Sequence, residues 1–470
     1  MIGAKQFEVN YKQFTAGMTT TDFTSDGGFG PSSVNINPLS QVGVMRATAT
    51  PTDASTNLAG NIIASCEDSR SSSFADRLFV DGSANYYTLS SGTLTKQKTG
   101  TATTHYIYGT TDMVSFLGKT YTSLDNDLSQ WDVAGNTLDE SYWVTTKAQS
   151  SLSSSDRHPL LVYEGNLFIA DANQLHTLNS SLTAAAGVLV LNTNERIVAL
   201  GIDPSTGLML LSVTVGPNYS DGINNKSFVY LYDGYSSKPR RKLPVDEMIT
   251  AFYNVGGTVF VGFGRRLGYW NGNGVSFLRN LDKTTAGTAT DLPYRHHFAH
   301  IGNTLFVVNG QNVLAYGELQ QGGRKVFWYP YQQTSGTHIG AICNVNNTTL
   351  GVAYATNKLY LADLTSTSTG SGYFYLNNVN FERPIKLHMV RVVTTGVSAT
   401  GAAGANSTIA IANERNQTKN PTNNSFYTTT TKYVYDFQFG GEIIQTLQPY
   451  FALGDGFGII RIIFYFDPYE

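Results

Sequence analysis

A short pattern of apolar and polar positions recurs along the middle of the chain. Each copy has a short apolar strand, a turn with Gly or Asn, a second strand that reads roughly Leu-Phe-Val, and a third strand that ends in Tyr or Leu. The clearest copies are AFYNVGGTVFVGFGRRLGYW around Val259 and FAHIGNTLFVVNGQNVLAYG around Leu305. The second strands carry seven anchor residues: Leu78, Tyr121, Leu167, Leu208, Val259, Leu305 and Leu350.

The spacing of these anchors indicates one architecture. Successive anchors lie 41 to 51 residues apart, which is the period of a four-stranded propeller blade. Both faces of such a blade are apolar, so each blade must stack on its neighbours, and seven copies close a ring. The predicted fold class is therefore all-β, with a β-propeller of about seven blades over residues 61–380. A series of unrelated meanders in a β-sandwich is the alternative.

The segments on either side of the repeat differ from it. Residues 1–60 are rich in Thr, Ser, Asn and Gly, which predicts an extended N-terminal arm. Such an arm can cross the propeller, supply an outer strand that closes the ring, or reach a neighbouring subunit, because unpaired strand edges need cover. Residues 381–470 read as alternating strands between polar loops, which predicts a C-terminal antiparallel β-sandwich.

The predicted strands of this last segment are PIKLHMVRVV, STIAIANE, KYVYDFQF, IIQTLQPYFAL and GIIRIIFYF. The final strand, Ile459 to Phe466, is β-branched and aromatic. Such a strand promotes aggregation when it is exposed, so we expect it to be central and covered.

Composition and charge narrow the function. Charged residues make up 14% of the chain, below the roughly 25% of an ordinary soluble domain, and aromatic residues reach 12%. Helix surfaces need Glu, Lys, Arg and Ala, so little helix is expected. The net charge of −3 argues against a protein that grips nucleic acid through phosphates, which needs a basic surplus. A wall past which DNA merely slides would be served well by low charge.

Cysteines and hydropathy point to a soluble chain. Cys66 and Cys343 lie 277 positions apart and define no disulfide framework, so we expect buried, reduced thiols. No segment reaches the about 18 continuous apolar residues that a membrane helix needs. The N-terminal sequence MIGAKQFEVNYKQF has no apolar stretch after its first lysine, so no secretion signal is expected.

Three glycine-containing segments resemble catalytic or phosphate-binding motifs without matching them. GKT at residues 118–120 resembles the end of a P-loop, but the first glycine of the motif would fall at Met113 and the surroundings read strand-turn-strand. GFGRRLG at residues 262–268 lacks dinucleotide-binding spacing, so its glycines are expected to relieve crowding between strands. GVSATG at residues 396–401 is one residue too long for a nucleophile elbow.

Three histidines, His296, His297 and His300, form a candidate metal cluster. In an extended stretch His296 and His300 share one face and His297 points the other way. No acidic or thiol side chain adjoins them in the sequence, so a metal site would need ligands from elsewhere. A structural role is the preferred interpretation.

A second candidate metal site is the segment with Asp125, Asp127 and Ser129, which resembles the opening of a calcium loop. Gln130 stands where the motif needs glycine, and Asn136 replaces the closing bidentate glutamate. A polar hairpin turn explains the same residues.

Charged candidates complete the search for chemistry. The basic run KPRRK at residues 238–242 reads as a solvated loop, or else as a docking patch for an acidic partner or phosphate. Asp203, Glu247 and Asp363 lie on different predicted blades, and a propeller glycosidase needs converging carboxylates. Nothing in their local sequence singles them out, and the repeated Ser-x-Asp-x-Gly-x-x-Trp box of sialidases is missing. We predict no catalytic residue, no cofactor and no metal.

The order of parts resembles that of a known group of proteins. Blades such as VYEGNLFIA and HIGNTLFVV follow a Gly- and Thr-rich arm and precede strands that end with IIRIIFYF. In these respects the chain resembles the propeller-bearing tail proteins of tailed bacteriophages, particularly the tail-hub or nozzle protein of short-tailed phages. The resemblance implies a fold and a setting, and it assigns no residue-level site.

What the resemblance implies is a ring of identical copies, six in number, below the portal and adaptor and around the DNA exit channel. Its partners would be other tail proteins, such as an adaptor, fibre or spike, and DNA would pass without specific binding. The protein would be assembled in the host cytoplasm and reside in the tail of the virion. We therefore predict a passive structural protein and not an enzyme, in which the arm and the C-terminal sandwich join the copies. A glycan-binding or glycan-cleaving propeller and an intracellular interaction scaffold are the alternatives.

Overall fold

The computed structural model shows an all-β chain. In the described residues the helical turns are η2 (Tyr142–Thr146) and η3 (Arg295–His297). The chain forms two compact units, a first unit of residues 53–311 and 333–361 and a second unit of residues 1–52, 312–332 and 362–470. The structure describes residues 7–12, 14, 33–39, 41, 43–54, 58–68, 77–101, 106, 110–154, 156–216, 226–282, 292–319, 322–332, 338–354, 357–366, 370–377, 379–397, 407–413, 417–426, 430–454 and 457–469.

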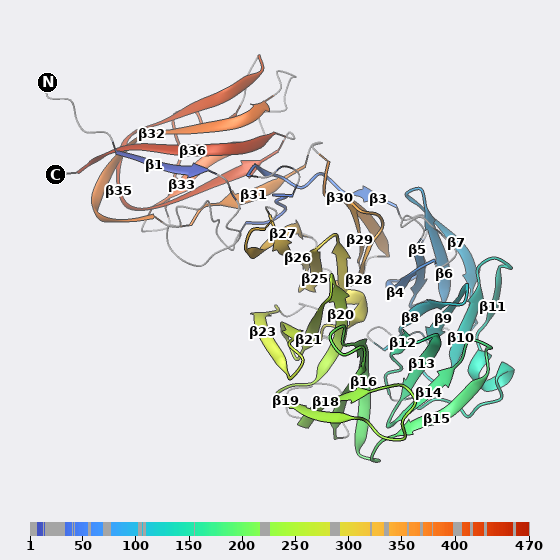
Figure 1. Cartoon of the computed structure of the whole chain (residues 1–470). Helices are drawn as coiled ribbons and strands as arrows, with labels where there is room; N and C mark the ends of the chain where they lie inside the picture. The colour runs from blue at the N-terminus through green and yellow to red at the C-terminus, as the bar shows by residue number, and fades with distance from the viewer. Residues whose placement is uncertain are drawn as a thin grey trace, which may run out of the picture. The chain divides into compact units, whose positions relative to one another are not determined.

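Seven four-stranded antiparallel sheets follow one another along the chain and form the blades of a β-propeller (Figure 1). The inner strands, which contact those of the adjacent blades, are β4 (Ile62–Glu67), β8 (Met113–Phe116), β12 (Leu160–Tyr163), β16 (Glu195–Ile202), β20 (Ile249–Val255), β24 (Phe298–Ile301) and β28 (Ile339–Asn344). The second strands are β5 (Arg77–Asp81), β9 (Lys119–Ser123), β13 (Asn166–Asp171), β17 (Met209–Val215), β21 (Thr258–Phe263), β25 (Thr304–Asn309) and β29 (Thr349–Tyr354).

The third and outer strands complete each blade. The third strands are β6 (Asn85–Ser90), β10 (Leu128–Asp132), β14 (Gln174–Leu178), β18 (Lys226–Tyr232), β22 (Arg266–Trp270), β26 (Asn312–Glu318) and β30 (Lys358–Asp363). The outer strands are β7 (Thr93–Thr99), β11 (Thr137–Asp139), β15 (Ala184–Val190), β19 (Arg241–Val245), β23 (Val275–Asn280), β27 (Lys325–Gln332) and β3 (Thr52–Asp53).

The repeat in the sequence marked the second strand of every blade. Five anchors are each the second residue of a second strand, and all five are buried: Leu78, Leu167, Val259, Leu305 and Leu350. Tyr121 is the third residue of β9, and Leu208 directly precedes β17. The prediction of an all-β chain with a seven-bladed propeller is confirmed.

The N-terminal arm completes the last blade. Strand β3 pairs with β30, so six blades are built from consecutive strands and the seventh takes its outer strand from the other end of the sequence. The N–H of Ala54 donates to the carbonyl oxygen of Leu359 at 2.9 Å, and Lys358 Nζ lies 2.6 Å from Asp53 Oδ2. Of the three roles expected for the arm, closure of the ring is thereby confirmed.

Apolar side chains fill the space between neighbouring blades. Between the third and fourth blades, Phe168 and Leu175 pack with Leu211 and Tyr230. Burial of one such side chain contributes roughly 1.5–3 kcal/mol, so the stacked faces supply much of the stability of the ring. Similar clusters lie between the other blades of the first unit.

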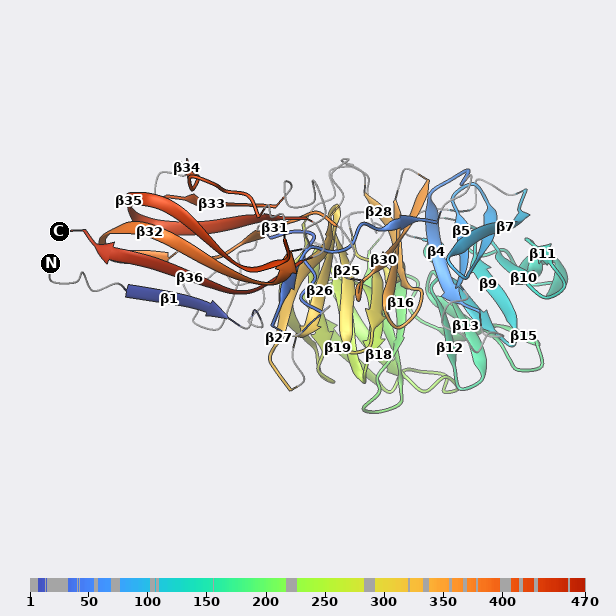
Figure 2. The ribbon, with the colours of Figure 1, turned by 90° about the horizontal axis from the view of Figure 1, so that it is seen from above.

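The second unit contains an eight-stranded antiparallel sheet, in which long strands run side by side (Figure 2). Its strand order is β1-β36-β32-β35-β33-β34, with β2 also on β36 and β31 also on β35. These strands are β1 (Phe7–Lys12), β2 (Met45–Arg46), β31 (Gly372–Tyr375), β32 (Val379–Val397), β33 (Thr408–Ala412), β34 (Thr418–Lys419), β35 (Lys432–Leu453) and β36 (Gly458–Pro468). The predicted antiparallel C-terminal β-structure is confirmed, and its strands belong to one continuous sheet.

Two details of this sheet bear on the expectations. KYVYDFQF and IIQTLQPYFAL are not separate strands, because Gly440 and Gly441 adopt φ of 66° and 82° and let β35 continue through a bulge opposite His388. The final strand β36 is central, as expected, because β32 pairs with one edge and β1 and β2 with the other. Its residues Ile462 and Phe464 are fully buried.

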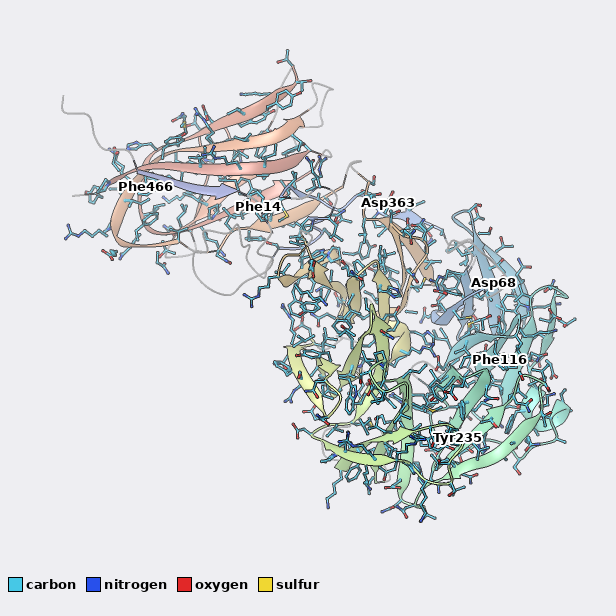
Figure 3. All side chains as sticks on the ribbon, viewed as in Figure 1. Phe14, Asp68, Phe116, Tyr235, Asp363 and Phe466 are labelled. Atoms are coloured by element: carbon cyan, nitrogen blue, oxygen red, sulfur yellow. The ribbon has the colours of Figure 1, made fainter. Side chains whose placement is uncertain are left out.

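The arm is bound along its length within the second unit. Besides β1 and β2, Val34 forms a bridge with Tyr373, and the N–H of Ile36 donates to the carbonyl oxygen of Tyr329 in β27 at 3.2 Å. Phe14, labelled in Figure 3, is buried with its ring 5.3 Å from that of Phe374 in an edge-to-face contact. The arm therefore supplies both hydrogen bonds and core side chains to its own chain.

The close approach at Gly262 yields a stability prediction. A Cβ at this position would lie 2.7 Å from Cγ of Pro293, which confirms that this glycine relieves crowding. We expect Gly262→Ala to destabilise the chain by about 1–3 kcal/mol, because the ring of Pro293 must shift. Gly274→Ala is the control, because its Cβ would meet no atom within 4 Å. Thermal unfolding of both variants checks this, and equal melting temperatures would contradict it.

Candidate functional site

A short segment spans the axis of the propeller at one end. Residues 293–297, which we call the axial plug, include η3 and lead into β24. The plug forms hydrogen bonds to five other blades through Ser65, Asp112, Leu160, Thr250 and Gly340. The last four of these lie at the N-terminal ends of inner strands, so the plug closes the axis there.

Strong side-chain hydrogen bonds hold the plug. The hydroxyl of Tyr294 donates to the carbonyl oxygen of Gly340 at 2.7 Å, and Arg295 Nη1 donates to that of Leu160 at 2.9 Å. Thr250 Oγ1 donates to the carbonyl oxygen of Pro293. These contacts come from the first or second residue of three inner strands, which fixes the plug to the rigid part of the fold.

Asp112, which directly precedes β8, is the electrostatic centre of this region. Its Oδ1 lies 2.9 Å from Nε2 of His296 and accepts the N–H of Met113 at 2.8 Å. Its Oδ2 accepts the N–H of Leu160 at 2.9 Å and lies 3.5 Å from Arg295 Nη1. Burial opposes ionisation, but Arg295 and His296 outweigh it and hold the pKa of Asp112 at about 2. The carboxylate is therefore ionised at neutral pH.

Both ring nitrogens of His296 are engaged. Nδ1 accepts the N–H of Ser65 at 3.3 Å, so the proton of the neutral ring is on Nε2 and is donated to Asp112. A general base or a metal ligand needs a nitrogen lone pair directed at its substrate or ion. The geometry therefore makes His296 a link between the plug and the first two blades.

The other two histidines of the predicted cluster have separate surroundings. The ring of His297 lies 3.9 Å from that of Tyr294, and burial together with nearby cationic side chains lowers its pKa to about 3. His300 Nδ1 lies 3.1 Å from the hydroxyl of Tyr253, and burial lowers the pKa of this histidine too. The expectation that His296 and His297 lie in an extended stretch is wrong, because η3 turns the backbone there.

An axial cavity of about 480 Å³ lies beside the plug, within the first unit. Its polar lining includes Ser65, Glu67, Arg77, Arg295, His296 and Asn344. Its apolar lining includes Val114, Leu161, Val162, Tyr253 and Phe298. Glu67 and Asn344 are the last residues of β4 and β28, so the cavity extends from the plug toward the C-terminal ends of the inner strands.

Arg77 is a buried cation in the wall of this cavity. Its side chain is 5% exposed, whereas that of Glu67 is 56% exposed. Arg77 Nη2 donates to Glu67 Oε1 at 2.9 Å and also to Asn344 Oδ1. The guanidinium is thus held in the wall by a carboxylate that reaches solvent and by an amide from the neighbouring blade.

Both thiols also line the axial cavity. Cys66 lies on β4 and Cys343 on β28, and neither is in a disulfide. Burial raises the pKa of Cys66 to about 12 and that of Cys343 to about 11, so both are protonated and poorly nucleophilic at neutral pH. The expected reduced thiols are confirmed, with Cys343 buried and Cys66 half-buried.

The three carboxylates considered for hydrolysis each stabilise a turn. Asp203 accepts hydrogen bonds from Ser205 and Thr206, and Asp363 accepts two from Thr365. Glu247 Oε1 lies 3.2 Å from Arg266 Nη1. These contacts are local, and the structure brings Asp112 to the axis instead.

The residues that resembled a calcium loop also have structural partners. Asp127 Oδ1 accepts the N–H groups of Trp143 and Val144 at 3.1 Å and so caps η2, and its Oδ2 accepts the hydroxyl of Ser141 at 2.8 Å. The carbonyl oxygen of Asp125 lies 3.0 Å from His158 Nε2, and Ser129 Oγ lies 2.8 Å from the Tyr86 hydroxyl. Within the residues that the structure describes, no group of three His, Cys, Asp or Glu side chains is placed to hold a metal ion.

The remaining motifs fall in hairpins and outer strands. Lys119, in the segment that resembled a P-loop, pairs with Asp132 beside the turn between β8 and β9. In the basic run, Arg240 pairs with Asp233 and Lys242 of β19 pairs with Glu195, so two of its charges are balanced within their own blade. Residues 398–401 of the GVSATG segment lie outside the described residues.

Comparisons with known proteins add no family. A scan against protein-family models finds no match, and a search of curated proteins finds no relative. Among solved structures, a streptogramin B lyase matches with a TM-score of 0.49 and 8% identity, over 67% of this chain and 98% of that one. A chain of a mitotic checkpoint complex matches with a TM-score of 0.43 and 11% identity, over 68% and 96%. At these scores and identities neither match carries an argument about function.

One further feature concerns membranes. Among the described residues, no helix has the length and apolar character that a membrane crossing requires.

The sequence analysis missed the residues that gather at the axis. Asp112 and His296 are 184 positions apart, and Arg77 and Asn344 are 267 apart. No local pattern links such pairs, because their proximity depends on the closure of the ring. The one available signal was the run Arg295-His296-His297 directly before an inner strand, where polar residues are not needed for the blade pattern.

Proposed function

We propose that this chain is a virion structural protein of a phage tail, one copy of a tail-hub or nozzle ring around the DNA exit channel, and that it acts as a passive scaffold without catalysis. The observation that carries the proposal is the order of the parts. An N-terminal arm, a seven-bladed propeller and a C-terminal antiparallel sheet follow one another, and the arm is built into both the last blade and the sheet. This order agrees with the resemblance in the sequence to propeller-bearing tail proteins.

The axial plug bears on the path of the DNA. The plug spans the axis of the propeller, and the cavity of about 480 Å³ beside it is far too small for a duplex. DNA would therefore run along the lumen between copies and not through a propeller. The net charge of −3 favours this role, because few phosphate contacts would form and few would have to be broken as DNA moves.

The contacts of the acidic residues support a passive role over a glycan-cleaving one. Asp203 and Asp363 accept hydrogen bonds within their turns, and Asp112 is held ionised by Arg295 and His296. A hydrolase of glycans needs one carboxylic acid that stays protonated and a second that acts as base or nucleophile. The low pKa of Asp112 makes it unsuited to the first of these roles.

The proposal predicts a closed ring of six copies. Light scattering coupled to size-exclusion chromatography, on the full-length chain alone and with the adaptor, measures the mass of the assembly. Binding to duplex DNA should be weak and nearly independent of salt. A chain that stays monomeric in assembled particles, or one that binds duplex DNA with a steep salt dependence, would show the proposal to be wrong.

A further inference from the structure

The axial cavity has the size and lining of a ligand pocket. Its volume of about 480 Å³ falls within the about 300–1,000 Å³ of ordinary small-molecule sites. The plug closes one end, and the exposed carboxylate of Glu67 shows that solvent reaches the wall. Such pockets commonly join an apolar wall with a few polar groups that fix orientation, and this one has both.

The polar groups of the cavity carry little net charge. Arg77 is paired with Glu67 at 2.9 Å, and Arg295 is paired with Asp112 at 3.5 Å. A ligand with a strong net charge would therefore find each opposite charge already neutralised. The same groups still present N–H donors and carboxylate or amide acceptors, and Asn344 offers both kinds of hydrogen bond.

The apolar wall lies on inner strands of other blades. The rings of Phe298 and Tyr253 stack with centroids 5.8 Å apart and planes 25° from parallel, and Leu161 and Val162 extend this surface. Val162 is 37% exposed although it lies on an inner strand, because it borders the cavity. A flat ligand with carbon–hydrogen bonds on its face would cover this wall.

We propose that the axial cavity binds a neutral saccharide of one or two rings. Its hydroxyl groups, each both donor and acceptor, match the paired ions and Asn344, and the carbon–hydrogen face of the ring packs on Phe298 and Val162. The site is independent of the proposed role in a tail, because it rests on residues of the propeller alone. It gives the propeller a binding activity that needs no catalytic carboxylate.

Ligand-observed saturation-transfer NMR, followed by calorimetric titration, tests the site. The probes are glucose, galactose, N-acetylglucosamine and lactose, with glucuronate and inorganic phosphate as charged comparisons. We expect at least one neutral sugar to bind the full-length chain with a Kd of about 1 mM, and more tightly than either charged probe. Absence of binding by all four neutral sugars, or tighter binding of glucuronate or phosphate, overturns the proposal.

Paired variants locate the binding. Val162→Phe fills the cavity from its wall, and Val190→Phe on the outer strand of the same blade, where valine is 57% exposed, is the matched control. Val162→Phe should weaken binding by about tenfold or more, and Val190→Phe should leave it unchanged. Asn344→Ala, which removes a polar group without filling space, should also weaken it, with melting curves to verify folding. Equal binding by Val162→Phe and wild type, or equal loss in Val190→Phe, overturns the assignment.

Discussion

Deletion of residues 1–54 should leave a chain that does not fold. The deletion removes β1, β2 and β3, and with β3 the outer strand of the seventh blade. It also removes four fully or nearly fully buried side chains: Phe14, Ile36, Val44 and Met45. At roughly 1.5–3 kcal/mol each, their loss alone amounts to about 6–12 kcal/mol, which equals the whole stability of many proteins. We expect insoluble protein or a circular-dichroism spectrum without a cooperative melting transition.

A shorter deletion is the control for this experiment. Removal of residues 1–6, which precede β1, should leave the melting temperature within a few degrees of that of the full-length chain. If the chain without residues 1–54 melts as cooperatively as the full-length chain, the arm is dispensable and the closure of the ring by β3 is wrong. The outcome also bears on assembly, because an arm that is part of its own fold has less length left to reach a neighbouring copy.

The propeller was predictable because its signal is local and repeated. Each second strand is buried between two neighbouring strands and two neighbouring blades, so it must be apolar at nearly every position, as in Leu305 to Val308. Seven such strands at regular spacing leave few alternative folds. The pattern therefore located five anchors at the same position of their strands.

The closing strand and the bulge were beyond this kind of analysis. Strand β3 has two exposed residues, Thr52 and Asp53, and is held through backbone hydrogen bonding that any sequence can provide. In β35, Gly440 and Gly441 suggested a turn, but their positive φ angles serve a bulge within one strand. In both places the backbone decides the structure, and the side chains carry no distinctive pattern.

The axial site was only partly visible in the sequence. The histidine run was noted, but its partner Asp112 comes from a different blade. An isolated aspartate before an apolar strand is common in loops, so nothing marked it as the centre of a network. Buried ion pairs of this kind depend on the three-dimensional closure of the fold, and only the structure brings their members together.

Asp112→Ala should destabilise the protein by about 3–5 kcal/mol, because it leaves buried partners without their acceptor. The N–H groups of Met113 and Leu160, the ring of His296 and the guanidinium of Arg295 all contact this carboxylate. The plug would lose its link to the second blade. Chemical unfolding monitored by tryptophan fluorescence measures the change in the free energy of unfolding.

The same carboxylate predicts a dependence of stability on pH. Its folded pKa of about 2 lies below the roughly 3.9 of an unfolded aspartate, so its contribution is fully present above about pH 4 and is lost as the pH falls toward 2. That contribution is about 2 kcal/mol at neutral pH. In Asp112→Asn this part of the acid sensitivity should disappear, whereas Asp363→Asn, at an exposed turn, should keep it. If the difference in unfolding free energy between wild type and Asp112→Asn is the same at pH 6 and pH 3, Asp112 is not the ion-pair centre that holds the plug in place.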